Sequence, residues 1–369
     1  MLIAAIETSC DETSVAVLRG NEKNSSVQIL SNIVSSQIKL HAKWGGVVPN
    51  LAAREHVKNI IPVLQQALLS AKVQLNQVDL FSVTNGPGLI PALLVGVNTA
   101  KTLCYFHQKP LLGIHHVEGH LTGAFFDNYS TCKITPDDLP LLCLTVSGGH
   151  TQLIYSKNFL EYEIIGETQD DAAGEAFDKV AKMLEVGYPG GPIVEKLASE
   201  YLSEHGHSDT LKLPRPMLKN NNFDFSFSGL KTAVLYQWEN QKNSAPEQAL
   251  VDLKKQFCYE FQQAVTEVLT KKTVAAIQKH KPQTVILAGG VAANQTIRAA
   301  LQKEISQNIP KTKFLSPPMT LCGDNAAMIG AAAFFRFQKL KKQNKLESLL
   351  QNWKNLPTLA NASINAKLN

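Results

Sequence analysis

The sequence lacks the features of secreted, membrane-spanning and disulfide-linked proteins. Its six cysteines are scattered, form no CxxC pair and in part stand in apolar stretches such as 141–144, which is typical of reduced, buried thiols. No apolar run approaches the roughly 18 residues that a membrane-spanning helix needs. The first residues, MLIAAIE, show neither the basic segment nor the long apolar segment of a leader peptide. We therefore expect a soluble, cytoplasmic protein with no membrane partner.

Outside its C-terminal end, the chain also lacks an excess of positive over negative charge. The net charge is +5, but from Arg336 onward seven basic residues stand against one acid, Glu347, so the rest of the chain is close to neutral. A basic tail can contact phosphate groups, yet charge runs on helices are more often a solvated face. The charge therefore gives only weak support for a nucleic-acid partner and does not locate its surface.

Apolar periodicity indicates an α/β fold. The chain has 369 residues, more than one hydrophobic core usually serves, so two lobes are expected. A strand at 2–6, a polar turn at 7–14 and a strand at 15–18 begin the chain, and the same pattern returns at 141–155. Strands alternate with helices after each unit, which indicates mainly parallel sheets. The sequence thus predicts a duplicated, two-lobed α/β protein with a cleft between its lobes.

The remaining elements follow from the same periodicities. The turn-rich segment 128–140 is expected to connect the lobes. Helices are expected at about 51–70, 91–105, 171–184, after Pro192, at 249–280 and after Asp324, and strands at 80–83, 111–114 and 284–288.

Four glycine-rich turns stand at the ends of expected strands or before expected helices: 85–88, 147–149, 190–191 and 289–290. Glycine lets backbone N–H groups approach an anion closely, and a following helix adds its dipole. Most glycine turns are only turns, but four of them together favour a nucleotide cradle. None matches the phosphate-binding GxxxxGK[ST] or the dinucleotide-binding GxGxxG pattern.

Acidic residues are dense at 170–179, where a helix is expected to begin. Asp171, Glu175 and Asp178 have the spacing of one helix face. Acids near a helix N-terminus are favoured by the dipole without any other role. Asp178 lies further into the helix, so we expect it to accept hydrogen bonds from sugar hydroxyls.

The segment HVEGH at 116–120 presents two imidazoles four residues apart. His116 and His120 can bind one metal ion on a helix face, although such a pair also arises by chance. This is not the HExxH of zinc peptidases, because Glu118 follows His116 by two positions. Asp324, before the last helix, is the candidate third ligand, or else that helix's N-cap. Two histidines and one carboxylate suit iron(II) or zinc.

Taken in order along the chain, these segments resemble one family closely, the bacterial tRNA N6-adenosine threonylcarbamoyltransferases. The matching motifs are IETSCDET (6–13), GGVVP (45–49), NGPG (85–88), HVEGH (116–120), VSGGHT (146–151), DDAAGEAFDK (170–179), YPGGP (188–192), FSFSGLK (225–231), AGGVAAN (288–294) and GDN (323–325).

The resemblance implies an actin-like fold of the sugar-kinase/heat-shock-ATPase (ASKHA) type. It implies transfer of the threonylcarbamoyl group from threonylcarbamoyl-AMP to the N6 amine of the adenosine next to the anticodon in tRNAs that read ANN codons, with release of AMP. The first lobe would comprise residues 1–125 and about 322–345, and the second lobe 126–321. Residues 346–369 would form a basic tail of unknown role.

The resemblance also assigns roles to individual residues. The metal ligands would be His116, His120 and Asp324, and the metal would be one divalent ion, iron(II) in preference to zinc. Asp11 and Glu12 would assist transfer. The adenylate would bind to Thr145, Val146, Ser147, Gly148, Gly149, Asp178, Gly191, Glu195 and Asn294, with Glu195 at the ribose. The partners implied are tRNA, a degenerate paralogue (TsaB-like) and a small ATPase (TsaE-like).

Three other functions compete with this one. An actin-fold small-molecule kinase or ATPase would use the same cleft, but it has no use for His116 and His120. A metallopeptidase would use the two histidines, but Glu118 is out of phase for a general base. A catalytically inactive scaffold would not need the metal ligands and Asp178, all of which are present.

Overall fold

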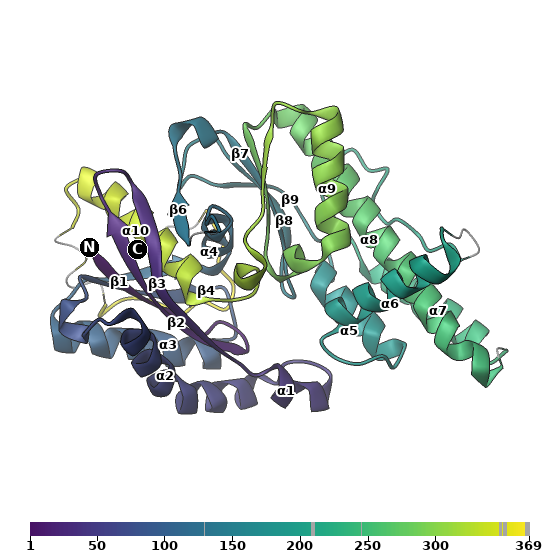
Figure 1. Ribbon diagram of the computed structural model, residues 1–369, viewed down its shortest axis with the longest axis horizontal. Helices are drawn as coiled ribbons and strands as arrows, with labels where there is room; N and C mark the ends of the chain where they lie inside the picture. The colour runs from purple at the N-terminus through teal and green to yellow at the C-terminus, as the bar shows by residue number, and fades with distance from the viewer. Residues whose placement is uncertain (129, 208–210, 245, 347–348, 350–352, 366–369) are drawn as a thin grey trace.

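The computed structural model describes residues 1–369 except 129, 208–210, 245, 347–348, 350–352 and 366–369. Two sheets dominate the molecule (Figure 1), and helices separate and flank them. The first sheet has the order β5-β4-β1-β2-β3-β6, and the second has the order β11-β10-β7-β8-β9. The strands are β1 (Leu2–Glu7), β2 (Glu12–Asn21), β3 (Ser26–Ser36), β4 (Leu80–Gly86), β5 (Leu111–His115), β6 (Thr131–Lys133), β7 (Leu141–Val146), β8 (Thr151–Ser156), β9 (Glu163–Glu167), β10 (Thr284–Ala288) and β11 (Lys313–Leu315).

The strand order shows that the two lobes repeat one topology. In the first sheet, β1 pairs antiparallel with β2 and parallel with β4, and β4 pairs parallel with β5. In the second, β7 pairs antiparallel with β8 and parallel with β10, and β10 pairs parallel with β11. The third strand of each lobe, β3 or β9, continues the antiparallel side. The predicted duplication is therefore present in the sheet connectivity.

The helices form three layers around the sheets. They are α1 (Ile38–His41), α2 (Pro49–Ala71), α3 (Ile90–His107), α4 (His116–Gly123), α5 (Ala173–Met183), α6 (Gly190–His205), α7 (Ser228–Lys242), α8 (Leu250–His280), α9 (Gln295–Asn308) and α10 (Ala326–Lys342). Helices α2 and α3 cover one face of the first sheet, and α5 to α9 pack on the far face of the second. Helices α4 and α10 lie between the two sheets.

Strand alternation explains how one sheet serves two cores. Successive side chains of a strand point to opposite faces. In β1, Ile6 packs toward α2 and α3, while Ala5 packs toward α4 and α10. In β7, Leu144 packs toward α5 to α9, while Cys143 packs toward α4 and α10. Both sheets thus enclose the α4–α10 layer.

Most of the expected elements are present, with bounds close to those predicted from the sequence. The segment 128–140 does not only connect the lobes, because β6 within it pairs with β3 and extends the first sheet. This strand lies inside the range expected for the second lobe. The sequence did not predict β3, β6, β9, β11, α7 and α9. Of these, β6, β9 and β11 are edge strands, β3 lies between β2 and β6, and α7 and α9 bury only narrow apolar stripes.

The described part of the tail packs on the first lobe rather than extending into solvent. Leu356 and Ile364 are buried there, at 3% and 4% exposure. None of the helices in the described part of the chain combines the length and apolar character that a bilayer-spanning segment requires.

Candidate functional site

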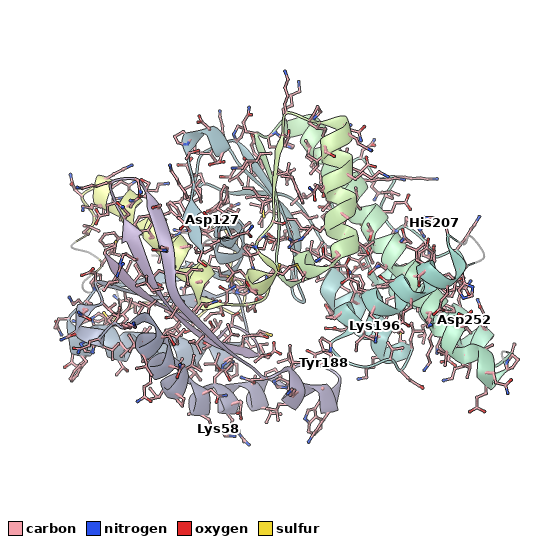
Figure 2. All side chains as sticks on the ribbon, in the orientation of Figure 1. Lys58, Asp127, Tyr188, Lys196, His207 and Asp252 are labelled. Carbon is pink, nitrogen blue, oxygen red and sulfur yellow. The ribbon has the colours of Figure 1, made fainter. Side chains whose placement is uncertain are left out.

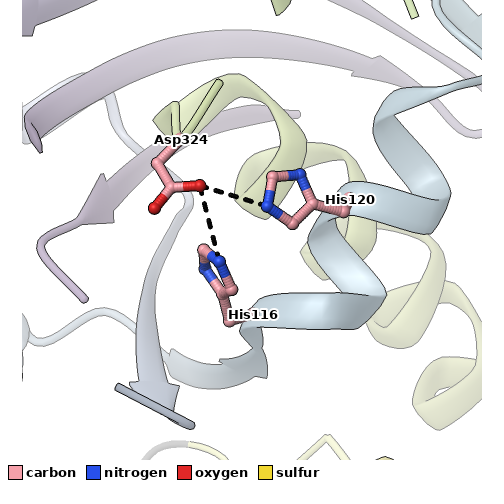
Figure 3. Close-up of side chains that lie close together, drawn as sticks. All are labelled: His116, His120 and Asp324. Carbon is pink, nitrogen blue, oxygen red and sulfur yellow. Dashed lines mark ion pairs between the residues drawn. The ribbon is translucent and has the colours of Figure 1, made fainter. Parts of the chain in front are cut away.

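The metal candidates meet where α4 and α10 begin. His115 ends β5 and caps α4, since its ring accepts a hydrogen bond from Val117 N. His116 and His120 follow on α4, and Asp324 directly precedes the N-cap of α10. Figure 3 shows both imidazoles pointing at the Asp324 carboxylate, with Oδ1 3.5 Å from His116 Nε2 and 3.1 Å from His120 Nε2.

Asp324 is not the helix N-cap. Asn325 fills that position, and its side-chain oxygen accepts from Met328 N at 3.2 Å. The carboxylate of Asp324 is thereby left to face the two histidines. Burial works against its charge, but His116 and His120 hold the pKa of this carboxyl well below its usual range.

The ring of His116 is oriented by the first hairpin. Its Nδ1 lies 3.1 Å from Glu7 Oε2 and 3.2 Å from Ser9 Oγ. Glu7 is itself held by Ser9 N and by Thr84 Oγ1, both at 2.5 Å. Burial opposes the charged imidazole, yet Asp324 and Glu7 raise the pKa of His116 to about 9. A carboxylate bound to Nδ1 orients the ring so that Nε2 points toward His120 and Asp324, as in many metal sites.

The three side chains fit a divalent metal ion. One ligand atom from each of His116, His120 and Asp324 lies within 4.8 Å of the others. His120 Nε2 is buried and makes no hydrogen bond, although Asp324 Oδ1 is 3.1 Å away. Burying a ring nitrogen without a hydrogen-bond partner costs free energy, and coordination of a metal ion would remove that cost. The donor set is therefore compatible with a divalent metal.

A second site is a cavity of about 220 Å³ beside the second sheet. Three of the four glycine-rich turns reach it, while the turn at 85–88 lies in the first lobe against the tail. Its lining residues are Gly148, Gly174, Phe177, Asp178, Pro189, Gly191, Pro192, Glu195, Gly290, Val291, Ala293 and Asn294.

The polar residues of this cavity are held by helix N-termini. Asp178 Oδ1 accepts from Gly190 N at 2.7 Å, and Glu195 Oε1 accepts from Gln295 N at 2.6 Å. Asn294 caps α9 through Ile297 N. Burial raises the pKa of both carboxyls; at Asp178, the negative charges of Asp11 and Glu175 add to this effect.

The other predicted adenylate residues differ in access. Gly148 lines the cavity, and a Cβ at Gly149 would meet nothing within 4 Å, so this backbone is open. Ser147 is buried and its Oγ accepts from His150 N at 3.0 Å, which fixes the turn. Thr145 and Val146 are fully buried in β7 and do not line the cavity.

Asp11 and Glu12 lie where the turn between β1 and β2 leads into β2. Burial raises the pKa of Glu12 well above its usual value, and the nearby charges of Asp11 and Asp324 raise it further. Asp11 also raises the pKa of Asp178. Charge interactions thus link Glu12 to the metal candidate Asp324, and Asp11 to Asp178 of the cavity.

Comparison with known proteins decides the family. A family model described as TsaD, tRNA N6-adenosine threonylcarbamoyltransferase, matches residues 28–331, well over half of the chain. The chain belongs to this family. The resemblance noted from the sequence is thus confirmed, and with it an acyltransferase that modifies tRNA.

Relatives with this description align along nearly their whole length. The tRNA N6-adenosine threonylcarbamoyltransferase of Enterococcus faecalis is 46% identical over 338 residues, which is 92% of this chain and 91% of the relative. That of Listeria innocua is 45% identical over 343 residues, 93% of each chain. The comparisons do not favour a small-molecule kinase.

Solved structures support the fold. The chain is similar to full-length HypF in a phosphate- and nucleotide-bound form, with a TM-score of 0.58, 12% identity and coverage of 92% of this chain and 46% of HypF. For T. kodakarensis HypF the TM-score is 0.56, with 13% identity and coverage of 95% and 49%. The chain thus spans about half the length of either HypF. Together with the repeated sheet topology, this confirms the two-lobed, actin-like ASKHA fold.

The contacts of Glu118 argue against the metallopeptidase. Arg336 donates to both of its carboxylate oxygens, with Nε 2.6 Å from Oε1, and Glu118 is fully buried. A carboxylate held in this ion pair is not available to activate water.

Most of the acidic run at 170–179 is structural. Asp170 accepts hydrogen bonds at the start of α7, and Asp171 pairs with Lys179 and Lys231. Glu175 pairs with Lys179. Of the acids in this run, Asp178 alone lines the cavity.

Two positioning groups were not singled out from the sequence. Glu7 and Ser9 orient His116, and the only signal for them was their place in the IETSCDET motif. Their function depends on β1 and α4 meeting in space, which spacing along the chain does not reveal.

Proposed function

We propose that this protein transfers the threonylcarbamoyl group from threonylcarbamoyl-AMP to the N6 amine of the adenosine beside the anticodon in tRNAs reading ANN codons. AMP is the second product. The observation that carries the proposal is the pairing, in a chain of this family, of a histidine–histidine–aspartate cluster with a polar cavity reached by three glycine-rich turns.

The adenylate would bind in the 220 Å³ cavity. Asp178 and Glu195 would offer carboxylate oxygens to ribose hydroxyls. Asn294, whose Nδ2 donates to Gln262 Oε1 at 2.9 Å, would offer its second amide hydrogen to the adenosine. Gly148, Gly191 and Gly290 have open space where a Cβ would stand, so their backbone can approach the phosphate and carbamoyl oxygens. Thr145 and Val146 would act indirectly, by holding the 147–149 turn at the end of β7.

The metal would be held by His116, His120 and Asp324, with iron(II) favoured over zinc by the resemblance. When bound, it would supply Lewis-acid stabilisation of a carbamoyl or phosphate oxygen. Glu7 and Ser9 would keep the imidazole of His116 in its binding orientation.

Transfer forms the bond from adenosine N6 to the carbamoyl carbon and breaks the bond from that carbon to the phosphate oxygen. The attacking amine loses one proton, and AMP leaves with the electron pair of the broken bond. Asp11 and Glu12 would accept this proton or orient the amine; in support, the charge of Asp324 acts on Glu12 and that of Asp11 acts on Asp178.

A second cavity, of about 270 Å³ and here called the cleft mouth, adjoins the first by sharing Asp178. The tRNA would reach the adenylate through this cleft mouth, in the cytoplasm. Ala42 and Gly45 from the first lobe and Lys182 and Tyr188 from the second line it, and Figure 2 shows Tyr188 between the lobes. A TsaB-like paralogue and a TsaE-like ATPase would assist, as in the family.

The test is to supply the protein, a source of threonylcarbamoyl-AMP and the two partners with unmodified tRNA, and to detect threonylcarbamoyladenosine by mass spectrometry. Product is expected from the wild type and is expected to disappear in His116→Ala and Asp178→Ala. The matched controls are His205→Ala, which alters an exposed side chain, and Glu175→Gln, which alters a half-exposed carboxylate that does not line the cavity. Absence of product from the wild type, with ATP consumed on a small molecule, would favour the kinase instead.

A further inference from the structure

Residues 353–364, here called the C-terminal strap, make a specific set of contacts with the first lobe. Leu356 is buried among residues of β1, β4, α2 and α3. Trp353 packs against Tyr105 of α3 with ring centroids 5.3 Å apart. Ile364, at the other end, enters the core that surrounds α4 and α10. The strap therefore crosses from the outer face of the first lobe to the layer that holds the metal candidates.

The middle of the strap binds the glycine-rich turn at 85–88. Leu359 N donates to Asn85 O at 2.8 Å, and Asn85 Nδ2 donates to Pro357 O at 3.2 Å. Gly88 N donates to Ala360 O at 3.1 Å. A Cβ at Gly86, whose φ is +157°, would lie 2.5 Å from Leu359 O. Glycine at 86 thus admits the strap, and glycine at 88 admits the close approach of Ser9.

The same turn contacts the groups that orient His116. Thr84, next to Asn85, donates to Glu7 Oε2, and that oxygen lies 3.1 Å from His116 Nδ1. Leu89 N, next to Gly88, donates to Ser9 O at 2.8 Å, and Ser9 Oγ lies 3.2 Å from the same nitrogen. Two short chains of contacts therefore lead from the strap to one imidazole.

A third chain of contacts runs through His115. Its Nε2 lies 3.0 Å from Ala362 O, so this nitrogen carries the proton and donates it. Its Nδ1 then accepts from Val117 N and caps α4. The strap consequently holds His115, directly before His116, and, through the 85–88 turn, the two partners of the His116 ring, Glu7 and Ser9.

We propose that the C-terminal strap positions the metal ligand His116. Its backbone oxygens and buried Leu356 hold β4, the 85–88 turn and the start of α4 in the arrangement that aims His116 Nε2 at His120 and Asp324. None of the strap contacts described above involves a proposed substrate residue, so the strap acts through the ligands. This inference concerns metal affinity and does not depend on which reaction the site performs.

The experiment measures the dissociation constant for Co²⁺, by chelator competition and by the visible spectrum, in the full chain and in a chain that ends at residue 352. Loss of partners that orient a ligand typically weakens metal binding about 10- to 100-fold, and that range is expected for the shortened chain. Binding of AMP, measured by calorimetry, is expected to stay within about twofold, because the cavity lies on the second sheet.

Two substitutions keep the test decisive if the shortened chain fails to fold. Leu356→Ala removes the buried anchor and is expected to weaken Co²⁺ binding several-fold, with circular dichroism confirming that the chain is folded. Asn355→Ala, its exposed neighbour, is the matched control and should bind as the full chain does. Unchanged Co²⁺ affinity and spectrum in a folded strap variant would overturn the proposal. A wild type without transferase activity would refute the proposed function but leave this result intact.

Discussion

At the scale of single residues, Asp178 is the sharpest test of the adenylate cavity. Asp178→Asn keeps an oxygen for Gly190 N, so α6 should still begin correctly, but it removes the charge offered to a ribose hydroxyl. A hydrogen bond to a charged group contributes about 1.5–3 kcal/mol, so AMP affinity should fall at least about tenfold. Isothermal calorimetry measures this. Glu175→Gln, three residues earlier and paired with Lys179, is the control, and an equal loss there would mean that charge alone matters.

Single residues were also where the sequence was most informative. HxxxH spacing, a carboxylate before a helix and glycine turns are local signals, and the structure brings His116, His120 and Asp324 within reach of one another. The glycine turn at 85–88 shows the limit of such signals. This turn is as rich in glycine as a ligand-binding turn, but glycine is needed at position 86 because the backbone of residue 359 approaches closely.

At the scale of elements, Asp170 ties the loop before α5 to the start of α7. It accepts from Phe227 N, Ser228 N and the hydroxyls of Ser226 and Ser228 at 2.5–3.1 Å. Replacing it by alanine should lower the free energy of unfolding by about 1–2 kcal/mol, the range for a lost helix cap. Urea denaturation measures this. Asp137→Ala, at an exposed position, is the control, and an equal loss there would contradict the capping role.

The pH dependence of this contribution has a definite sign. Burial raises the pKa of Asp170, but its hydrogen bonds outweigh burial and lower the pKa below the unfolded value of about 3.9. The carboxylate therefore stabilises the fold above about pH 3.9, and this stabilisation is lost as pH falls through the lower, folded pKa. The stability difference between the wild type and Asp170→Ala should shrink over that interval. A difference that stays constant would show that the carboxylate charge is not its source.

Strands and helices with a clear apolar pattern could be predicted from the sequence, and those without one could not. Strand 284–288 was predicted with its observed bounds because it is a short apolar run closed by a turn. Helix α7 was missed because only Leu230, Val234 and Trp238 are buried among polar neighbours, so its apolar stripe is narrow. Strand β6 was missed because three residues carry almost no periodic signal.

At the scale of the whole molecule, the repeated strand order follows from the repeated strand–turn–strand pattern, but the position of α4 does not. No local signal shows that α4 and α10 lie between the two sheets, because that layer is created by side chains of β1, β7 and β10 meeting them from both sides. The packing of the tail is equally hidden in the sequence, which shows there mainly a run of basic charge. Its apolar residues are few and widely spaced, and only the folded first lobe gives them a place to pack.

The cleft mouth gives the last prediction, which concerns how the whole molecule meets tRNA. Trp44 is 65% exposed beside the mouth residues Ala42 and Gly45, and the exposed Lys43 precedes it. An exposed indole with a neighbouring cation suits stacking on an unpaired base, which contributes about 1–3 kcal/mol. Trp44→Ala should therefore raise the KM for tRNA about 5- to 150-fold while AMP affinity stays unchanged.

The matched control is Tyr236→Ala, which removes an aromatic ring with 67% exposure from α7, outside both cavities. Steady-state kinetics at two salt concentrations separates stacking from charge, because loss of phosphate contacts would flatten the salt dependence and loss of stacking would not. Equal effects of the two substitutions would place the tRNA elsewhere. An effect of Trp44→Ala on AMP binding would instead show that the loop shapes the adenylate cavity.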